Sequence, residues 1–178
     1  MYNPEEDSYL LSDSLKNIVN KNNCEKILDM GSGSGIQTQT LISLGINPKN
    51  TTLIDIDNNV IEYLKKKFPM CKVIHSDLFS DVNEKFDLIV FNPPYLPENK
   101  YDKEKDTSGG KNGGETILRF LKQLKAHLNK NGKALLLLSS LTPMNKIKEE
   151  LKNHNFNIID RKKLFFEELF IYEIWLKN

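Results

Sequence analysis

Short apolar segments alternate with amphipathic helical patterns along most of this chain. Strands are predicted at 26–29, 51–56, 72–75, 86–91 and 134–138, and helices at 8–20, 36–44, 58–68, 115–128 and 143–154. Such alternation is typical of a parallel, doubly wound sheet with helices on both faces. Two more strands, at 156–164 and 169–176, are separated by a short acidic turn and predict a C-terminal antiparallel hairpin. The predicted fold is therefore α/β, with a mostly parallel, seven-stranded sheet.

The length of 178 residues fits one domain, spanning 1–178, with a single sizeable core. Its N-terminal segment, 1–24, is interpreted as a cap on the sheet, with Asp7 or Ser8 as the N-cap of the first helix. The connection at 97–114 is long for a compact domain and has a glycine-rich end. Its composition suits a plain surface loop and a substrate-covering loop equally well.

Charge and composition argue against several classes of partner. The formal net charge is +1 and only two of the 25 basic residues are arginine, so bulk attraction to nucleic acid is not expected. The N-terminus is acidic, unlike a signal peptide, and no apolar run reaches membrane-spanning length. Cys24 and Cys71 have no Cys or His at ligand spacing, so no metal site is predicted. We expect a cytoplasmic protein with no membrane contact.

The fourth predicted strand ends in Asn92-Pro93-Pro94-Tyr95. Two prolines fix the backbone and remove two N–H donors, so that nearby carbonyls have no competing amide. The corner therefore presents a rigid set of acceptors, from the Asn92 side chain and the Asn92 and Pro93 carbonyls, beside an aromatic ring. Such a site suits a planar nitrogen that carries N–H donors, although Asn and Pro are also ordinary turn residues.

The loops after the first three strands carry glycines and acids. Asp29 is followed by three glycines, at 31, 33 and 35, before the next helix, and the second and third strands lead to Asp55 and Asp77. Parallel strands bring these loops to one edge of the sheet, where ligands bind in such folds. A carboxylate there can accept the hydroxyls of a ribose, and the glycine spacing departs from the dinucleotide pattern. The edge fits a nucleoside that bears an amino acid better than a pyrophosphate.

These motifs together resemble those of class I S-adenosylmethionine-dependent methyltransferases of the HemK-like family, which methylate protein glutamines. The opening Tyr-Asn-Pro-Glu-Glu-Asp-Ser at 2–8 is similar to that of the short archaeal and eukaryotic release-factor branch, and so is Gly-Gly-Lys-Asn-Gly at 109–113. The Asn-Pro-Pro-Tyr motif is shared with DNA and RNA amine methyltransferases. The motif therefore indicates the reaction type, and the other two elements indicate a protein substrate.

The resemblance implies a Rossmann-like methyltransferase fold and a set of cofactor contacts. Asp29 and Gly31 would meet the methionine end of S-adenosylmethionine, whose product is S-adenosylhomocysteine, and Asp55 would hold the ribose. Asp77 and the Leu78 backbone would hold the adenine. The full set of implied cofactor residues is Ser8, Asp29, Gly31, Gly33, Gly35, Asp55, Asp77, Leu78 and Asn92. Ser8 stands where the branch usually has Thr, and Asp29 replaces a Glu often found there.

The same resemblance implies the substrate side of the site. Asn92 would bind the substrate amide, Pro93 would supply a carbonyl, and Pro94 and Tyr95 would complete the wall. The implied reaction is N-methylation of the glutamine in the Gly-Gly-Gln motif of a translation release factor. It also implies a small zinc-binding activator subunit that pairs along 71–75. The alternatives are a nucleic-acid adenine amine methyltransferase and a non-catalytic cofactor-binding subunit of a complex.

Overall fold

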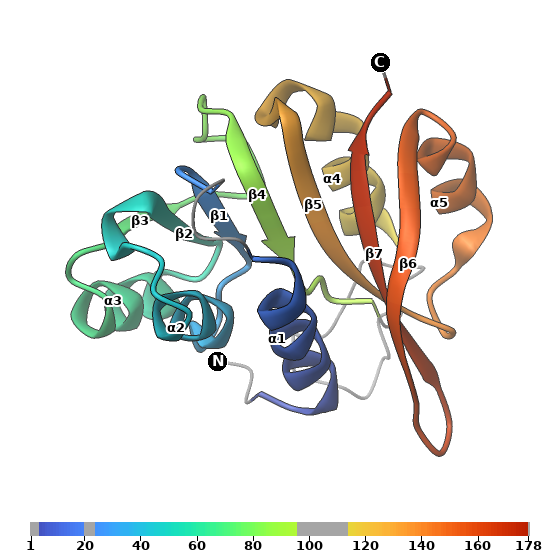
Figure 1. The fold of residues 1–178 in the computed structure, drawn as a ribbon, viewed down its shortest axis with the longest axis horizontal. Coiled ribbons are helices and arrows are strands. Elements are labelled where there is room, and N and C mark those ends of the chain that lie inside the picture. The colour runs from blue at the N-terminus through green and yellow to red at the C-terminus, as the bar shows by residue number, and fades with distance from the viewer. Residues whose placement is uncertain (1–3, 20–23, 96–113, 178) are drawn as a thin grey trace.

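The computed structural model describes residues 4–19, 24–95 and 114–177 of the chain. They form one seven-stranded sheet with the strand order β3-β2-β1-β4-β5-β7-β6 (Figure 1). The strands are β1 (Ile27–Met30), β2 (Thr51–Asp55), β3 (Lys72–His75), β4 (Phe86–Phe91), β5 (Leu128–Ser139), β6 (His154–Lys163) and β7 (Glu168–Leu176). β1 to β5 are parallel, whereas β7 runs antiparallel to both β5 and β6. The predicted sheet and its C-terminal hairpin are confirmed.

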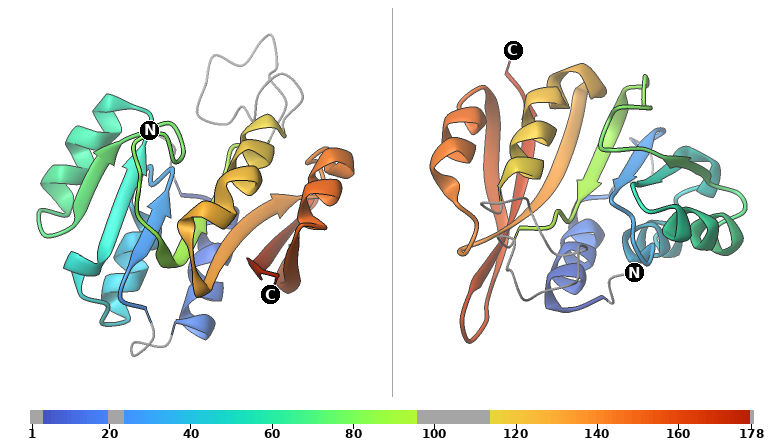
Figure 2. Two further views of the ribbon diagram at one scale, coloured as in Figure 1. Left: turned by 90° about the horizontal axis from the view of Figure 1, so that it is seen from above. Right: turned by 180° about the vertical axis from the view of Figure 1, so that it is seen from behind.

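Helices cover both faces of the sheet (Figure 2). α1 (Glu6–Ile18), α2 (Ile36–Ser43) and α3 (Asn58–Lys67) share one face, and α4 (Glu115–His127) and α5 (Met144–Leu151) lie on the other. A short 3₁₀ helix, Pro48–Asn50, precedes β2. Successive residues of β1 point to opposite faces of the sheet. Ile27 packs with α1 and α2 on one face, whereas Leu28 packs in the cluster of α4 and α5 on the other. Both side chains are fully buried, as expected for a parallel strand covered on two faces.

Several element boundaries differ from the sequence-based prediction, among them the starts of α1 and β5. α1 begins at Glu6, and its N-cap is Glu5 without a side-chain cap, so the prediction of Asp7 or Ser8 as the cap was wrong. Both residues instead lie buried in the first turn of α1. β5 begins at Leu128, six residues before the predicted start. Leu128 pairs with Phe86, the register shifts across the polar stretch 129–132, and the ladder resumes where Lys133 pairs with Leu88.

The order of the strands places the polar loops together. β1, β2, β3 and β4 are adjacent and parallel, so the loops after them lie at one edge of the sheet. The segment 97–113, with Tyr101 and the Gly-Gly-Lys-Asn-Gly element, lies outside the described residues, as does the start of the opening motif at 1–3. Within the described ranges, no helix has the length and apolarity needed to cross a membrane.

Candidate functional site

The glycine loop between β1 and α2 is a tight left-handed turn. Gly31, Gly33 and Gly35 have φ of +60°, +50° and +73°. Gly35 is the most constrained, because a Cβ atom there would lie 2.3 Å from Cε2 of Phe68. At Gly33 the same atom would meet nothing nearer than the Gly31 carbonyl oxygen at 3.9 Å. The space beside Gly33 is therefore open to a ligand, whereas Gly35 allows the loop to pack on α3.

Ser32 anchors this loop to the sheet, a role that the sequence analysis missed. Its backbone N–H donates to the Ile54 carbonyl at 2.9 Å, and its hydroxyl donates to the Asp29 carbonyl at 2.7 Å. The same hydroxyl accepts the Ile54 N–H at 3.1 Å. Ser32 is 5% exposed. A serine between glycines is common in turns, so only the tertiary structure reveals that it joins β1, β2 and the loop.

Asp29, the acid before the loop, is almost completely buried. Oδ2 accepts hydrogen bonds from the backbone N–H of Thr38 at 3.0 Å and from its hydroxyl at 2.7 Å. Burial raises the pKa of Asp29 to about 7, since the loss of hydration outweighs the two hydrogen bonds. Both bonds end on one oxygen, so Oδ1 is the atom that a cationic ligand could approach.

Asp55, at the end of β2, shapes the loops on either side of it. Oδ2 accepts the Gly33 N–H at 3.0 Å, and Oδ1 accepts the Asp57 N–H at 3.0 Å. Asp57 in turn accepts the Asn59 N–H at 2.7 Å and caps α3. The structure therefore brings Asp55 to the open side of the glycine loop, where it is partly exposed.

Asp77, after β3, is paired with a residue that the sequence analysis did not single out. Its Oδ2 accepts a hydrogen bond from Nη2 of Arg119 on α4 at 2.7 Å, and both side chains are nearly half exposed. Exposed pairs of this kind contribute at most about 1 kcal/mol, so the contact is easily exchanged for another. Leu78 has a φ of +52°, rare for a residue with a side chain, and the Ser76 hydroxyl donates to its carbonyl at 2.8 Å.

The Asn-Pro-Pro-Tyr corner meets the N-terminal helix. Nδ2 of Asn92 donates to Oδ2 of Asp7 at 3.1 Å and approaches Oγ of Ser8 at 3.4 Å. Oδ1 of Asn92 is buried and accepts no hydrogen bond from the described part of the chain. A buried acceptor without a donor costs about 1–3 kcal/mol, and such atoms are few in native proteins. The corner therefore holds an acceptor that is suited to an incoming N–H group.

Pro93 and Tyr95 complete this corner. Pro93 is buried, while Tyr95 is partly buried and packs against the core clusters of both sheet faces. Burial raises the pKa of the Tyr95 phenol well above its ordinary value, and the carboxylates of Asp7 and Glu167 raise it further. Tyr95 is therefore a neutral wall of the site and not a base.

A polar contact between α1 and α2 brings the N-terminal helix over the strand ends. Nε2 of Gln37 donates to the Ser8 carbonyl at 3.0 Å, and its Oε1 accepts from the Ser12 hydroxyl at 3.0 Å. Gln37 is only 5% exposed. This contact positions Ser8 beside Asn92, and it was also missed by the sequence analysis.

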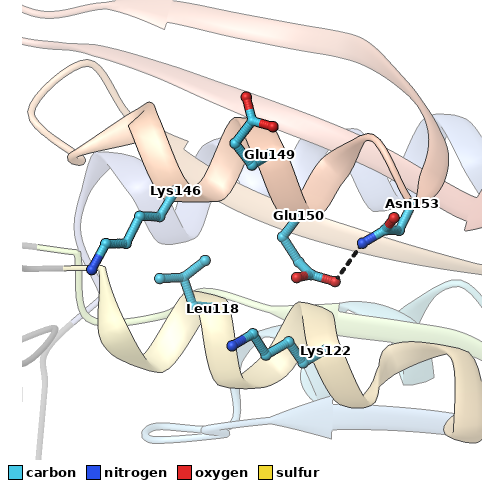
Figure 3. Close-up of a pocket in the computed structure, with 6 residues that line it drawn as sticks. All are labelled: Leu118, Lys122, Lys146, Glu149, Glu150 and Asn153. Carbon is cyan, nitrogen blue, oxygen red and sulfur yellow. Dashed lines mark hydrogen bonds between the residues drawn. The ribbon is translucent and has the colours of Figure 1, made fainter.

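A surface hollow also lies away from the strand ends. It has a volume of about 400 Å³, between α4 and α5, and is lined by Leu118, Lys122, Lys146, Glu149, Glu150 and Asn153 (Figure 3). None of the predicted site residues borders it. Its lining is mostly charged side chains on two helices, so we place the candidate site at the strand ends and not in this hollow.

Comparison with known proteins agrees with this geometry. The Methyltransferase small domain model matches residues 6–165. A protein of Methanocaldococcus jannaschii named "Putative protein N5-glutamine methyltransferase" is 36% identical over 98% of this chain and 91% of its own length. Methyltransferase HEMK2 of Homo sapiens is 31% identical over 67% of this chain and 63% of its own length.

A search of solved structures also finds methyltransferases with this fold. Mtq2 in the E. cuniculi Mtq2–Trm112 complex superposes with a TM-score of 0.76 at 25% identity, over 99% of this chain and 98% of that one. This chain belongs to the Methyltransferase small domain family of class I methyltransferases, and it is an S-adenosylmethionine-dependent enzyme. Within that class it is similar to the Methanocaldococcus protein named above and to Mtq2 and HEMK2.

Proposed function

We propose that the enzyme methylates the side-chain amide nitrogen of a protein glutamine, in the Gly-Gly-Gln loop of a translation release factor. The observation that carries this proposal is Oδ1 of Asn92, a buried acceptor with no donor among the described residues. A primary carboxamide offers the N–H that this atom lacks. The named relatives support the choice, since one carries the name "Putative protein N5-glutamine methyltransferase" and the Mtq2–Trm112 complex methylates the eRF1 termination factor.

The strand-end residues fit the cofactor. The open space at Gly33 admits a ligand next to the backbone, and the buried carboxylate of Asp29 suits the ammonium of the methionine end. We assign Asp55 to the ribose, because it lies at the open side of the glycine loop. The Ser8 hydroxyl lies 3.4 Å from Nδ2 of Asn92 and is assigned to the cofactor as well. For Asp77 to accept a hydrogen bond from the adenine amine, its pair with Arg119 has to open or share the carboxylate.

Catalysis in this arrangement consists mainly of positioning. When bound, S-adenosylmethionine supplies an electrophilic methyl group and becomes S-adenosylhomocysteine. Asn92 Oδ1 and the Pro93 carbonyl would each accept an N–H of the substrate amide, which aims the nitrogen lone pair and stabilises the positive charge that develops on nitrogen. Tyr95 would form the wall beside the amide plane. The methylated nitrogen then releases one proton to solvent. Correct positioning can lower a barrier by about 7–11 kcal/mol.

The pKa of Asp29 predicts how cofactor binding depends on pH. An ionised carboxylate attracts the cofactor ammonium and a protonated one does not. Because the pKa of Asp29 is raised to about 7, we expect the affinity for S-adenosylmethionine to fall as the pH decreases from 8 to 6. Titration calorimetry across this range measures it. In Asp29→Asn the dependence is expected to disappear together with most of the affinity; a flat profile in the wild-type enzyme would contradict the assignment.

The function is tested by methyl transfer to the release factor of the same host. The enzyme is assayed with labelled S-adenosylmethionine, with and without a small zinc-binding subunit from that host, and the Gly-Gly-Gln peptide is analysed by mass spectrometry. We expect one added methyl group on the glutamine. A release factor with Gln replaced by Asn in that motif is the matched control. Methyl transfer to host DNA or RNA, and not to the release factor, would overturn the substrate assignment.

The free edge of the sheet at β3 suggests where a partner subunit binds. β3 is an end strand, and within the described ranges no strand pairs with its outer side. Two exposed apolar residues lie near its ends: Met70, two residues before β3, is 57% exposed, and Ile56, whose carbonyl lies 2.9 Å from Nε2 of His75, is 63% exposed. We propose that a small zinc-binding subunit adds a strand along 71–75, which would satisfy the free backbone groups and cover this apolar surface. Mtq2, the structural neighbour, was solved in complex with Trm112.

A further inference from the structure

We propose that Asp7 is a positioning residue, whose carboxylate sets the orientation of the Asn92 side-chain amide so that Oδ1 faces the substrate. The expected effect of Asp7 on catalysis rests on the proposed function, whereas the orientation of the Asn92 amide does not. The two residues are 85 positions apart in the chain. The inference goes beyond the cofactor contacts implied by the motifs, because it assigns Asp7 to Asn92 and not to S-adenosylmethionine.

The chemistry of the contact determines which way Asn92 points. Oδ2 of Asp7 lies 3.1 Å from Nδ2 of Asn92, and Oδ1 of Asp7 accepts the Ser8 N–H at 2.5 Å. An ionised carboxylate only accepts hydrogen bonds, so the group that Asn92 turns toward Asp7 has to be its NH₂. The amide is planar, and its oxygen therefore points to the opposite side. The buried, unpartnered Oδ1 is a direct consequence of this contact.

The opposite orientation would disable the site. If the amide were rotated by half a turn, Asn92 would present two N–H donors to a substrate that also presents N–H donors. The substrate hydrogen bond would be lost, and the positive charge that develops on nitrogen would face positive hydrogens. Asp7 is only 6% exposed, so water cannot easily replace its side chain as the acceptor. Asp7 thus excludes the unproductive orientation.

α1 is held in place from two sides, which gives Asp7 a defined position. On one side Gln37 of α2 bonds the Ser8 carbonyl and the Ser12 hydroxyl. On the other side the Ser14 hydroxyl donates to Asp160 of β6 at 3.1 Å, and Glu6 forms an ion pair with Lys162 of the same strand. These contacts fix α1 relative to α2 and β6, and the bond from Asn92 to Asp7 joins its first turn to the residue after β4. The alignment of Asp7 with Asn92 is therefore built into the fold.

Three variants of the full-length enzyme test the inference. Asp7→Leu keeps the shape of the side chain but removes the acceptor, whereas Asp7→Asn can still present an oxygen to Asn92. Asp13→Leu is the matched control, because Asp13 is an exposed aspartate on the same helix, paired only with Lys16 among the described residues. We expect kcat to fall about 100-fold in Asp7→Leu, the scale of a misplaced reacting group. It should fall less than about tenfold in Asp7→Asn and stay unchanged in Asp13→Leu.

Two further readouts separate positioning from general damage. The Kd for S-adenosylmethionine and the thermal midpoint of Asp7→Leu should stay close to those of the wild-type enzyme. The side-chain NH₂ signals of Asn92 in ¹H–¹⁵N spectra, assigned by their loss in Asn92→Ala, should shift in Asp7→Leu and exchange faster with solvent. An equal loss of kcat and cofactor affinity, or Asn92 signals that do not move, would overturn the inference.

The spectra also separate this inference from the proposed function. They need no substrate, so they report on the orientation of Asn92 even if the wild-type enzyme transfers no methyl group to the release factor. In that case the proposed function fails, and a shift of the Asn92 signals in Asp7→Leu still supports the inference. An active wild-type enzyme whose Asp7→Leu variant retains full kcat would overturn the inference alone.

Discussion

Asn92→Ala is expected to lower kcat for methyl transfer by about 10³-fold, or about 4 kcal/mol, which is the scale of losing one preorganised hydrogen-bonding group at a reacting centre. The reason is that Oδ1 of Asn92 is the buried acceptor proposed to bind the substrate amide, and alanine offers no replacement. Steady-state kinetics with the release factor give kcat, and calorimetry gives the Kd for S-adenosylmethionine. The Kd should change much less than kcat, because the main cofactor contacts are assigned to the loops after β1, β2 and β3.

Asn157→Ala serves as the control for this variant. Asn157 is exposed on β6, at the opposite end of the sheet from β3, and its replacement should leave both kcat and Kd unchanged. Circular dichroism confirms that Asn92→Ala is folded. If kcat and cofactor affinity fell by the same factor, Asn92 would be primarily a cofactor residue and its assigned role would be incorrect.

Gly35→Ala is expected to lower the free energy of unfolding by about 2–5 kcal/mol and to impair cofactor binding. A residue with a side chain at φ +73° costs about 1–2 kcal/mol. The added Cβ atom, 2.3 Å from Cε2 of Phe68, overpacks the interface with α3 and costs about another 1–3 kcal/mol. This is a large part of the total stability of an ordinary domain, about 5–15 kcal/mol. Urea unfolding followed by fluorescence measures the change.

Gly33→Ala separates the two contributions to this loss. Gly33 also has a positive φ, +50°, but an added Cβ atom would meet no neighbour closer than 3.9 Å. It should therefore show only the backbone cost, about 1–2 kcal/mol. The loss in Gly35→Ala should also be smaller in a Phe68→Ala background, because the clash is then absent. Equal losses at Gly33 and Gly35 would show that the contact with Phe68 is relieved by a small shift of the ring.

Local patterns in the sequence predicted most of the secondary structure. The strands at 72–75 and 86–91 have the predicted limits, because turn residues bound these short apolar runs. The prediction was wrong where a local pattern competed with long-range pairing. β5 extends back to Leu128 through a polar stretch that resembles a turn, since Gly132 allows a close approach to the Phe86 carbonyl, where a Cβ atom would lie at 2.6 Å.

The candidate site was only partly predictable, because some of its residues act through contacts with residues distant in the chain. Its acids and glycines were found because each follows a strand, and parallel strands end at one edge of the sheet. Ser32, Gln37 and Arg119 were missed, because a serine between glycines, a glutamine in a helix and an arginine on a surface carry no local signal of what they contact. Each becomes visible only through a partner that is distant in the chain.

The sequence by itself determined the α/β class, the order of its elements and the corner at which the chemistry is proposed, because hydrophobic periodicity and the backbone limits of proline and glycine act over a few residues. The tertiary structure decided what those residues do. Packing of α1 against α2 and β6 places Asp7 next to Asn92, 85 positions away, and turns the Asn92 oxygen toward the site. Hydrogen-bond orientation depends on the partner, and for Asn92 the partner is supplied only by the folded chain.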